Sequence, residues 1–432
     1  MTRISSPQAI PDIGLYIWSD TPDQHDFWKA CGYTTMQLCD LGWHRNAENG
    51  MAEQHTQALA NGVKSLQADG FKVYIILFAN IKQYKGPEDV EPTGIGEKFH
   101  PSDEAEMKER LSYLRKTIEA CKSADGFTMF AGDPGGIPDF MGPGQLLDFV
   151  NMALKVKALV KEVAPEAEFN INPWCVSMFR TPNHDAMTKE FWLQETVEVK
   201  QLLDMEGIFG PETGIELPCH DYYRALTLRL YDEDPVLRAD PPLFPLKSDL
   251  DGLFDRQTKN VWAWPYFLMD EADDGDIGPG NTPLPQSETR YIHRFVRQAR
   301  ELGFNGIIGN WSYRGYLSKC MNTYAFARFC ADDRLTPRQV IEEYAAFVAR
   351  EDCRSTLVQI LLFLENNSNW QRKLPESAHV EDFDTTVQSG KQALELLEAV
   401  SPNEANAFPL PESTSQYLQR LKLRLQIIAE QE

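Results

Sequence analysis

The sequence predicts an α/β protein, a (β/α)8 TIM barrel with a C-terminal all-helical region. Short apolar runs alternate with helical segments eight times over roughly 300 residues, the repeat of a parallel barrel. No Gly-x-Gly-x-x-Gly follows the first apolar run, so an open dinucleotide-binding sheet has no support. We assign residues 1–318 to the barrel and residues 319–432 to a helical region packed on it.

The predicted barrel strands are short and mostly apolar. Lys72–Phe78 is apolar after its first residue, as expected of a parallel strand that is buried on both faces. The predicted strands are Ile13–Trp18, Thr34–Leu38, Lys72–Phe78, Phe127–Gly132, Glu168–Asn172, Gly214–Pro218, Val261–Met269 and Gly306–Gly309.

Helical segments separate these strands. Ser102-Asp103-Glu104 is a helix N-cap signal, and Gly70 and Gly303 each end a helix. The predicted barrel helices are Gln24–Cys31, Glu53–Asp69, Asp103–Ser123, Gly144–Val163, Lys189–Met205, Ser248–Thr258 and Glu288–Leu302. Further helices are predicted at Asn322–Cys330, Thr336–Arg350, Ser355–Asn366, Val380–Val400 and Glu412–Glu430, and we expect them to support the barrel rim.

Composition narrows the possible partners and the location. The net charge of −22 argues against nucleic acid, which requires clustered Lys and Arg. No apolar stretch has the roughly 18 residues of a membrane span, so no membrane partner is expected. The segment Met1–Pro7 has no apolar signal core, so we expect a cytoplasmic protein, or an exported one whose signal peptide has been removed.

The eight cysteines form no Cys-x-x-Cys pair and are expected to be reduced and buried. Nothing in the sequence indicates a cofactor or an oligomeric state.

Tryptophans and carboxylates recur near the ends of the predicted strands. Barrel active sites are built at the C-terminal ends of the strands, indole faces stack on sugar rings, and carboxylates cleave glycosidic bonds. The pattern therefore predicts a carbohydrate site, although any one of these tryptophans could equally fill the core. The tryptophans are Trp18, Trp43, Trp174, Trp264 and Trp311.

Asp133 is the predicted proton donor. It ends an apolar strand and is followed by Pro134-Gly-Gly136, a turn that lets backbone approach a ligand closely. Partial desolvation there would raise its pKa toward a useful range. A purely structural role as an Asx turn is the alternative. The second catalytic group, a base or nucleophile, is predicted among Glu216, Asp270 and Glu271.

The remaining predicted site residues are substrate contacts. Arg314 follows Trp311 and could pair with a substrate carboxylate as a bidentate fork. His44, His220 and Asp40 have no His-Glu-x-x-His spacing, so no metal site is predicted. The substrate-binding candidates are Trp18, Asp40, Trp43, His44, Arg45, Asn172, Trp174, His220, Asp221, Tyr222, Arg224, Trp264, Asn310, Trp311 and Arg314.

Two patches resemble known families. The strand from Gly126 to Asp133 and its Pro-Gly-Gly turn resemble the fourth-strand region of bacterial alpha-glucuronidases. The segments Gly303–Trp311, Asn322–Arg328 and Leu335–Tyr344 resemble the passage from barrel to C-terminal helices in alpha-glucuronidases and beta-N-acetylhexosaminidase-type enzymes. The resemblance implies a barrel with an acid on strand four and bases on later strands. Hexosaminidases carry two adjacent acids on that strand, whereas here Pro134 follows Asp133.

The residues and the resemblance together predict a glycoside hydrolase that acts on an oligo- or polysaccharide by carboxylate acid/base catalysis. Two other functions remain open. One is a non-catalytic carbohydrate-binding barrel, and the other is a metal-dependent isomerase, epimerase or lyase of a sugar acid.

Overall fold

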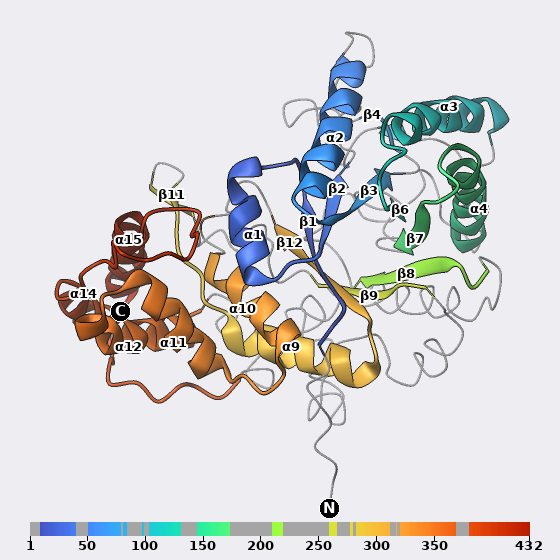
Figure 1. Cartoon of the computed structure of the whole chain (residues 1–432). Helices are drawn as coiled ribbons and strands as arrows, with labels where there is room; N and C mark the ends of the chain where they lie inside the picture. The colour runs from blue at the N-terminus through green and yellow to red at the C-terminus, as the bar shows by residue number, and fades with distance from the viewer. Residues whose placement is uncertain are drawn as a thin grey trace, which may run out of the picture.

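The structure is a computed structural model and describes residues 9–39, 51–78, 81–83, 97–98, 103–130, 145–172, 210–218, 259–265, 277–279, 282–311, 317, 320–368 and 380–432. Its centre is a closed barrel of parallel strands in the order β1-β12-β9-β8-β7-β6-β3-β2 (Figure 1). The predicted (β/α)8 barrel is therefore confirmed.

The barrel strands occupy the predicted runs to within a few residues. Their bounds are β1 (Asp12–Ile17), β2 (Thr35–Cys39), β3 (Lys72–Phe78), β6 (Gly126–Phe130), β7 (Glu168–Asn172), β8 (Thr213–Pro218), β9 (Val261–Trp264) and β12 (Gly306–Trp311). Two small antiparallel ladders lie outside the barrel: β4 (Ile81–Gln83) with β5 (Glu97–Lys98), and β10 (Ile277–Gly278) with β11 (Thr282–Pro283).

The helices that follow the strands begin and end at the signals read in the sequence. The Asp103 carboxylate accepts from the backbone N–H groups of Ala105 and Glu106 and caps its helix. The two glycines predicted to end helices, Gly70 and Gly303, lie in the left-handed region at φ 91° and 94°. Gly32, which was not predicted as a helix end, caps α1 in the same way at φ 102°. The helices around the barrel are α1 (His25–Cys31), α2 (Met51–Ala68), α3 (Glu104–Ala120), α4 (Gln145–Val163) and α9 (Thr289–Leu302). The predicted helices Lys189–Met205 and Ser248–Thr258 lie outside the described residues.

Glycines make room for large side chains inside the barrel. A methyl group on Gly306 would overlap the indole of Trp262, and one on Gly126 would overlap the ring of Tyr74. A methyl group on Gly214 would likewise overlap the side-chain amide of Asn170. Close packing inside a barrel alternates large and small residues. The space that a side chain would take at each glycine is therefore occupied by a large side chain from a neighbouring strand.

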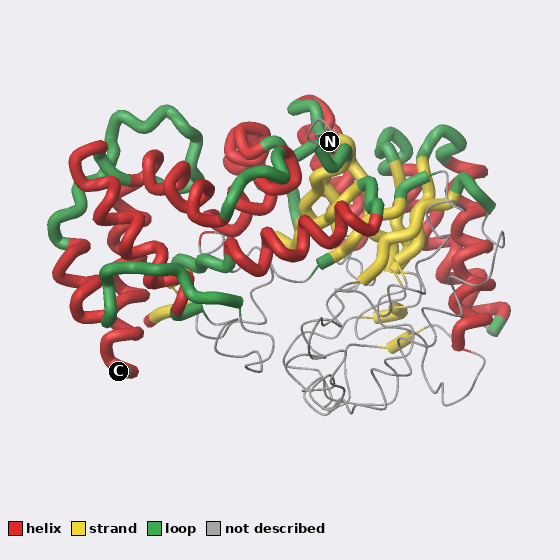
Figure 2. The backbone as a smooth tube through the Cα atoms, turned by 90° about the horizontal axis from the view of Figure 1, so that it is seen from below, coloured by secondary structure: helices red, strands yellow, loops and turns green. Residues whose placement is uncertain are grey.

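The C-terminal helices lie beside the barrel, next to α9 (Figures 1 and 2). They are α10 (Cys320–Ala331), α11 (Pro337–Val348), α12 (Arg354–Asn366), α14 (Gly390–Leu397) and α15 (Thr414–Gln431). The predicted helix Val380–Val400 is wrong over its first half, because helix α14 begins only after its cap Ser389. Before that cap, Gln359 Oε1 accepts from the Thr386 backbone, and Asn366 Oδ1 accepts from the backbone N–H of Phe383.

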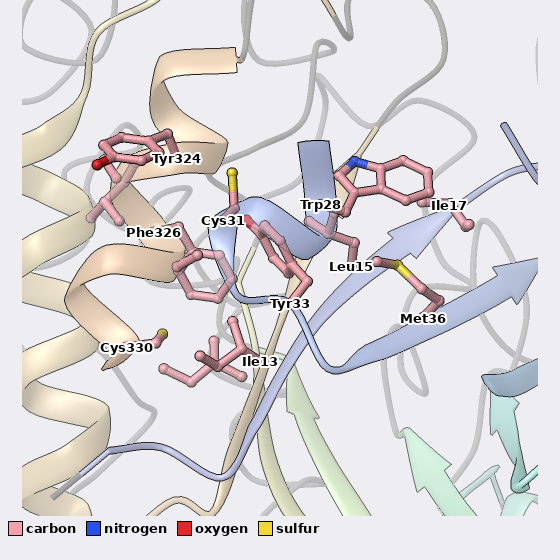
Figure 3. Packing of buried hydrophobic residues seen from close by; sticks show 14 of the residues in the cluster. Ile13, Leu15, Ile17, Trp28, Cys31, Tyr33, Met36, Tyr324, Phe326 and Cys330 are labelled. Carbon is pink, nitrogen blue, oxygen red and sulfur yellow. The ribbon is translucent and has the colours of Figure 1, made fainter. Parts of the chain in front are cut away.

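One apolar core joins the barrel to the first C-terminal helix. Figure 3 shows Tyr33, which precedes β2, beside Phe326 of α10 in the cluster that also contains Ile13 of β1. The Tyr33 hydroxyl donates to the Thr323 carbonyl at 2.8 Å, and its ring centroid is 6.0 Å from that of Phe326. The six described cysteines are unbridged and buried, Cys31 and Cys330 among them in this core.

A buried carboxylate fastens the barrel to the helical region. Glu365 of α12 accepts from the backbone N–H groups of Thr289 and Arg290 at 3.0 and 2.9 Å, so it caps α9 from another helix. The Ser287 hydroxyl donates to the same carboxylate at 2.5 Å. The Arg290 guanidinium lies 3.5 Å from it and also donates to the Glu365 carbonyl.

The last helix reaches segments that follow two barrel strands. The Arg420 guanidinium donates to the carbonyls of Pro283 and Leu317 at 2.6 and 3.0 Å. Its charge is paired with Glu412. Pro283 follows β9 and Leu317 follows β12, so α15 holds the chain after strands seven and eight of the barrel. None of the described helices is both long enough and apolar enough to span a bilayer.

Candidate active site

Four of the predicted site residues have described side chains: Trp18, Asn172, Glu216 and Trp264. Asn310 and Trp311 are placed by their backbone, as the last two residues of β12. The other candidates lie outside the described residues: Asp40, Trp43, His44, Arg45, Asp133, Trp174, His220, Asp221, Tyr222, Arg224, Asp270, Glu271 and Arg314.

Glu216 lies at the centre of the barrel. It is the fourth residue of β8, its side chain points inward, and it is fully buried. Three side chains donate to its Oε1: Gln37 Nε2 at 2.7 Å, Thr128 Oγ1 at 2.6 Å and Asn170 Nδ2 at 3.2 Å. Asn172 Nδ2 donates to Oε2 at 3.4 Å. The carboxyl group is thus held by donors from β2, β6 and β7.

Gln37, Thr128 and Asn170 were missed by the sequence analysis, although a signal was present. Each is a polar residue with an apolar residue on either side, as in Met36-Gln37-Leu38. Successive side chains of a strand point to opposite faces, so a polar residue flanked by apolar ones on a barrel strand points into the barrel. The three residues and Glu216 are all fully buried, which identifies one shared polar cluster.

Burial raises the pKa of the Glu216 carboxyl from 4.5 to about 7, although the hydrogen bonds from Thr128, Asn170, Asn172 and Gln37 lower it. The donors are neutral hydroxyl and amide groups, so no positive charge compensates the loss of water. Glu216 therefore exchanges its proton near neutral pH, which is the range useful for general acid or base catalysis.

Aromatic side chains pack together at strand positions next to the Glu216 cluster. Trp264 follows Trp262, the register partner of Glu216, by two residues. Its ring centroid lies 5.4 Å from that of Phe130 and 5.9 Å from that of Tyr16, edge-on to both. Trp264 is 1% exposed, so in this structure it is packed as core, as the alternative interpretation of the tryptophans allowed. Trp18 is half-buried and lies edge-on to Tyr16, with 6.4 Å between the centroids.

A second polar cluster lies toward the N-terminal ends of the strands. The Tyr74 hydroxyl and Asn260 Nδ2 donate to Glu168 Oε2 at 2.5 and 2.8 Å. Lys259 Nζ lies 3.5 Å from the other oxygen of this carboxylate. Partial burial raises the pKa of Glu168, but these hydrogen bonds and Lys259 outweigh it and leave the pKa below its ordinary value. Inside the same barrel, the pKa of Glu168 is therefore lowered and that of Glu216 is raised.

Within the described part of the chain, no three His, Cys, Asp or Glu side chains are grouped so that they could hold a metal ion. The carboxyl groups of Glu216 and Glu168 are instead surrounded by hydrogen-bond donors.

Comparison with known proteins gives structural likeness only. No protein-family model matches the sequence, and no curated protein matches it either. A glycoside hydrolase family 5 enzyme from Prevotella bryantii B14 is similar with a TM-score of 0.46 and 10% identity, over 75% of this chain and 99% of that one. A GH30 endoxylanase from Clostridium papyrosolvens C71 gives 0.38 and 13%, over 76% and 73%. D-Psicose 3-epimerase from Clostridium cellulolyticum H10 gives 0.35 and 8%, over 83% and 99%. The activity has to be argued from the site itself.

Proposed function

We propose that the protein is a glycoside hydrolase that cleaves a glycosidic bond by carboxyl acid/base catalysis, with Glu216 as the proton donor. The observation that supports this most is the carboxyl group itself, which is fully buried at the barrel centre and has a pKa of about 7. Glycoside cleavage requires an acid that keeps its proton near neutral pH until the leaving oxygen needs it.

The hydrogen bonds indicate which oxygen of Glu216 carries the proton. Three side chains donate hydrogen bonds to Oε1. A proton on Oε1 would point at the NH2 groups of Gln37 and Asn170, which cannot accept a hydrogen bond, and only the Thr128 hydroxyl could accept one. Among the described residues, Asn172 is the donor to Oε2, at 3.4 Å. Asn172 is the last residue of β7, so Oε2 is the oxygen on the side of the strand C-terminal ends. The neutral acid therefore presents its O–H toward the end of the barrel where substrates bind.

This assignment changes the roles expected from sequence. Asp133, the predicted acid, follows the end of β6 by three residues and lies outside the described residues, as do Asp270 and Glu271 after β9. We propose that one of these three supplies the second carboxylate, as base or nucleophile. The alpha-glucuronidase and hexosaminidase resemblance, the anionic-sugar role of Arg314 and the division at residue 318 stay predictions.

The full burial of Glu216 favours one alternative function. Glu216 is fully buried, and Tyr16, Phe130 and Trp264 pack together as an aromatic layer next to its cluster. We infer that this layer must open for a substrate to reach Oε2. If it stays closed, Glu216 is a structural acid and the protein is a non-catalytic carbohydrate-binding barrel whose ligand rests above the layer.

A comparison of two Glu→Gln variants tests the proposed function. Wild-type protein is screened against polysaccharides and aryl glycosides, with product detected by chromatography and sugar binding measured in parallel. Glu216→Gln should lower cleavage at least about 100-fold, the usual contribution of a general acid. Glu343→Gln is the matched control, since Glu343 is a part-buried acid of α11 paired with Arg328, outside the barrel.

Saturable sugar binding without product in the wild type would indicate the binding barrel. Cleavage that is abolished by EDTA and restored by Mg2+ or Mn2+, but unaffected by Glu216→Gln, would contradict the proposed acid. Full activity in Glu216→Gln without any metal dependence would contradict it as well.

A further inference from the structure

A chain of hydrogen bonds runs from Glu216 to the opposite end of the barrel. Asn170 Nδ2 donates to Glu216 Oε1, and Asn170 Oδ1 accepts from Asn260 Nδ2, both at 3.2 Å. Asn260 Nδ2 also donates to Glu168 Oε2 at 2.8 Å. Asn170 is fully buried, Asn260 is 8% exposed, and Glu168 is about one third exposed at 32%. The order Glu168–Asn260–Asn170–Glu216 connects a partly solvated carboxylate to the buried acid.

The chemistry of the two ends fixes the orientation of both amides. An ionised carboxylate only accepts hydrogen bonds, so Asn260 must turn its NH2 group toward Glu168. The same NH2 group faces Asn170, which must therefore turn its oxygen toward Asn260 and its own NH2 toward Glu216. If the Asn170 amide were flipped, its NH2 would face the NH2 of Asn260 and its oxygen would face Glu216 Oε1, and both hydrogen bonds would be lost.

The strand that carries Glu216 is shaped to admit this pair of amides. Gly214 lies two residues before Glu216 on β8 and is the register partner of Asn170. A methyl group on Gly214 would overlap Asn170 Oδ1 and come within 3.0 Å of Asn260 Cβ. Glycine at this position therefore permits the contact between Asn170 and Asn260.

We propose that Asn260 and Glu168 are positioning residues, which act through Asn170 to hold an N–H donor against Glu216 and so set the proton affinity of the acid. That Glu216 acts as the acid rests on the proposed function. The effect of the relay on the proton affinity of Glu216 can be measured without substrate. Because the relay stabilises the carboxylate, it keeps the burial of Glu216 from raising its pKa further.

The relay links Glu216, which has neutral neighbours, to a charged group. The four side chains that donate to it are neutral. Among the described residues, the ionisable groups at the inward-facing positions of the surrounding strands are Asp12 and Tyr16 on β1, Cys39 on β2, Lys72 and Tyr74 on β3, and Glu168 on β7. Tyr16 is bonded to Cys39, Lys72 to Asp12, and Tyr74 donates to Glu168. Asn260 and Asn170 join Glu168 to Glu216 through hydrogen bonds.

The test is a titration of Glu216 itself. In protein labelled with 13C at the glutamate carboxyl carbon, the Glu216 signal is assigned by its loss in Glu216→Gln and followed against pH. The wild-type midpoint is expected near 7. Asn260→Leu removes the group that orients Asn170 and should raise the midpoint by about one pH unit, the effect of losing one donor to a charged group.

Two further variants separate the relay from general damage. In an Asn170→Leu background, Asn260→Leu should produce no additional shift, because Asn260 acts only through Asn170. Asn305→Ala is the matched control, since Asn305 also bonds the start of β9, through the Val261 N–H at 2.8 Å, but does not contact Asn170. Its Glu216 midpoint should equal that of the wild type.

An unchanged midpoint in Asn260→Leu would overturn the relay, as would a shift that persists at full size in the Asn170→Leu background. Should Asn260→Leu fail to fold, Asn260→Ala makes the same test with the same two outcomes. The titration uses no substrate, so it is independent of the cleavage assay. If the relay is refuted, Glu216 can still be the catalytic acid, and if no cleavage is found, the titration still tests the relay.

Discussion

Replacing Glu216 by Gln should remove a large pH dependence of stability. The pKa of this carboxyl is about 7 in the folded protein, against 4.5 for an exposed glutamate. The difference corresponds to about 3 kcal/mol, at roughly 1.4 kcal/mol for each pH unit. Since the folded state holds the proton more tightly, this contribution is fully present below pH 4.5 and is lost as the pH rises through 7.

Gln cannot ionise and fits the same space, so Glu216→Gln should keep its stability across this pH range. The free energy of unfolding is measured by urea denaturation at several pH values between 4.5 and 8.5, for the wild type and the variant. Other titrating groups, such as the half-buried His293, are common to both proteins and cancel in the difference. The variant should gain about 3 kcal/mol relative to the wild type between the two ends of the range.

A difference between the two proteins that stays constant with pH would refute this reasoning. It would mean that the four hydrogen bonds to Glu216 compensate its burial completely. A difference that changes in the opposite direction would mean that the carboxylate is stabilised by folding, as we expect for Glu168, whose pKa is lowered.

Two substitutions test the packing that positions the site, each by urea denaturation at pH 6. Gly306→Ala should cost about 1–3 kcal/mol, because its methyl group would overlap the buried indole of Trp262, and an unchanged midpoint would show that the barrel interior is looser than described. Glu365→Leu should cost about 3–5 kcal/mol, because it removes the buried carboxylate beside Arg290 and leaves the first N–H groups of α9 uncapped. A cost below about 1 kcal/mol would mean that water or Asp382 replaces Glu365.

The strands were predictable because a barrel strand is short, apolar and bounded by turn residues. Lys72–Phe78 and Glu168–Asn172 have the predicted bounds. The failure at Val380–Val400 has a physical cause, because contacts from α12 hold Phe383 and Thr386 in a non-helical segment, and helical periodicity does not report tertiary contacts.

The site was less predictable than the fold. Glu216 was identified as a candidate from its place on a strand, but its donors come from strands far away in the sequence, such as Gln37 on β2. A sequence shows that Gln37 points inward, but the register that brings it to Glu216 depends on closure of the barrel. Trp264 was predicted as a stacking wall, and its edge-on packing against Phe130 could not be read from spacing.

The most direct test of Glu216 as proton donor compares leaving groups. An acid catalyst matters most when the departing oxygen needs a proton, and matters little for an activated leaving group such as dinitrophenolate. Aryl glycosides of the sugar found in the screen are hydrolysed by the wild type and by Glu216→Gln, and kcat/KM is plotted against the leaving-group pKa. We expect the variant to lose at least about 100-fold on poor leaving groups and far less on dinitrophenyl glycosides. Equal losses on all leaving groups would contradict a proton-donor role for Glu216.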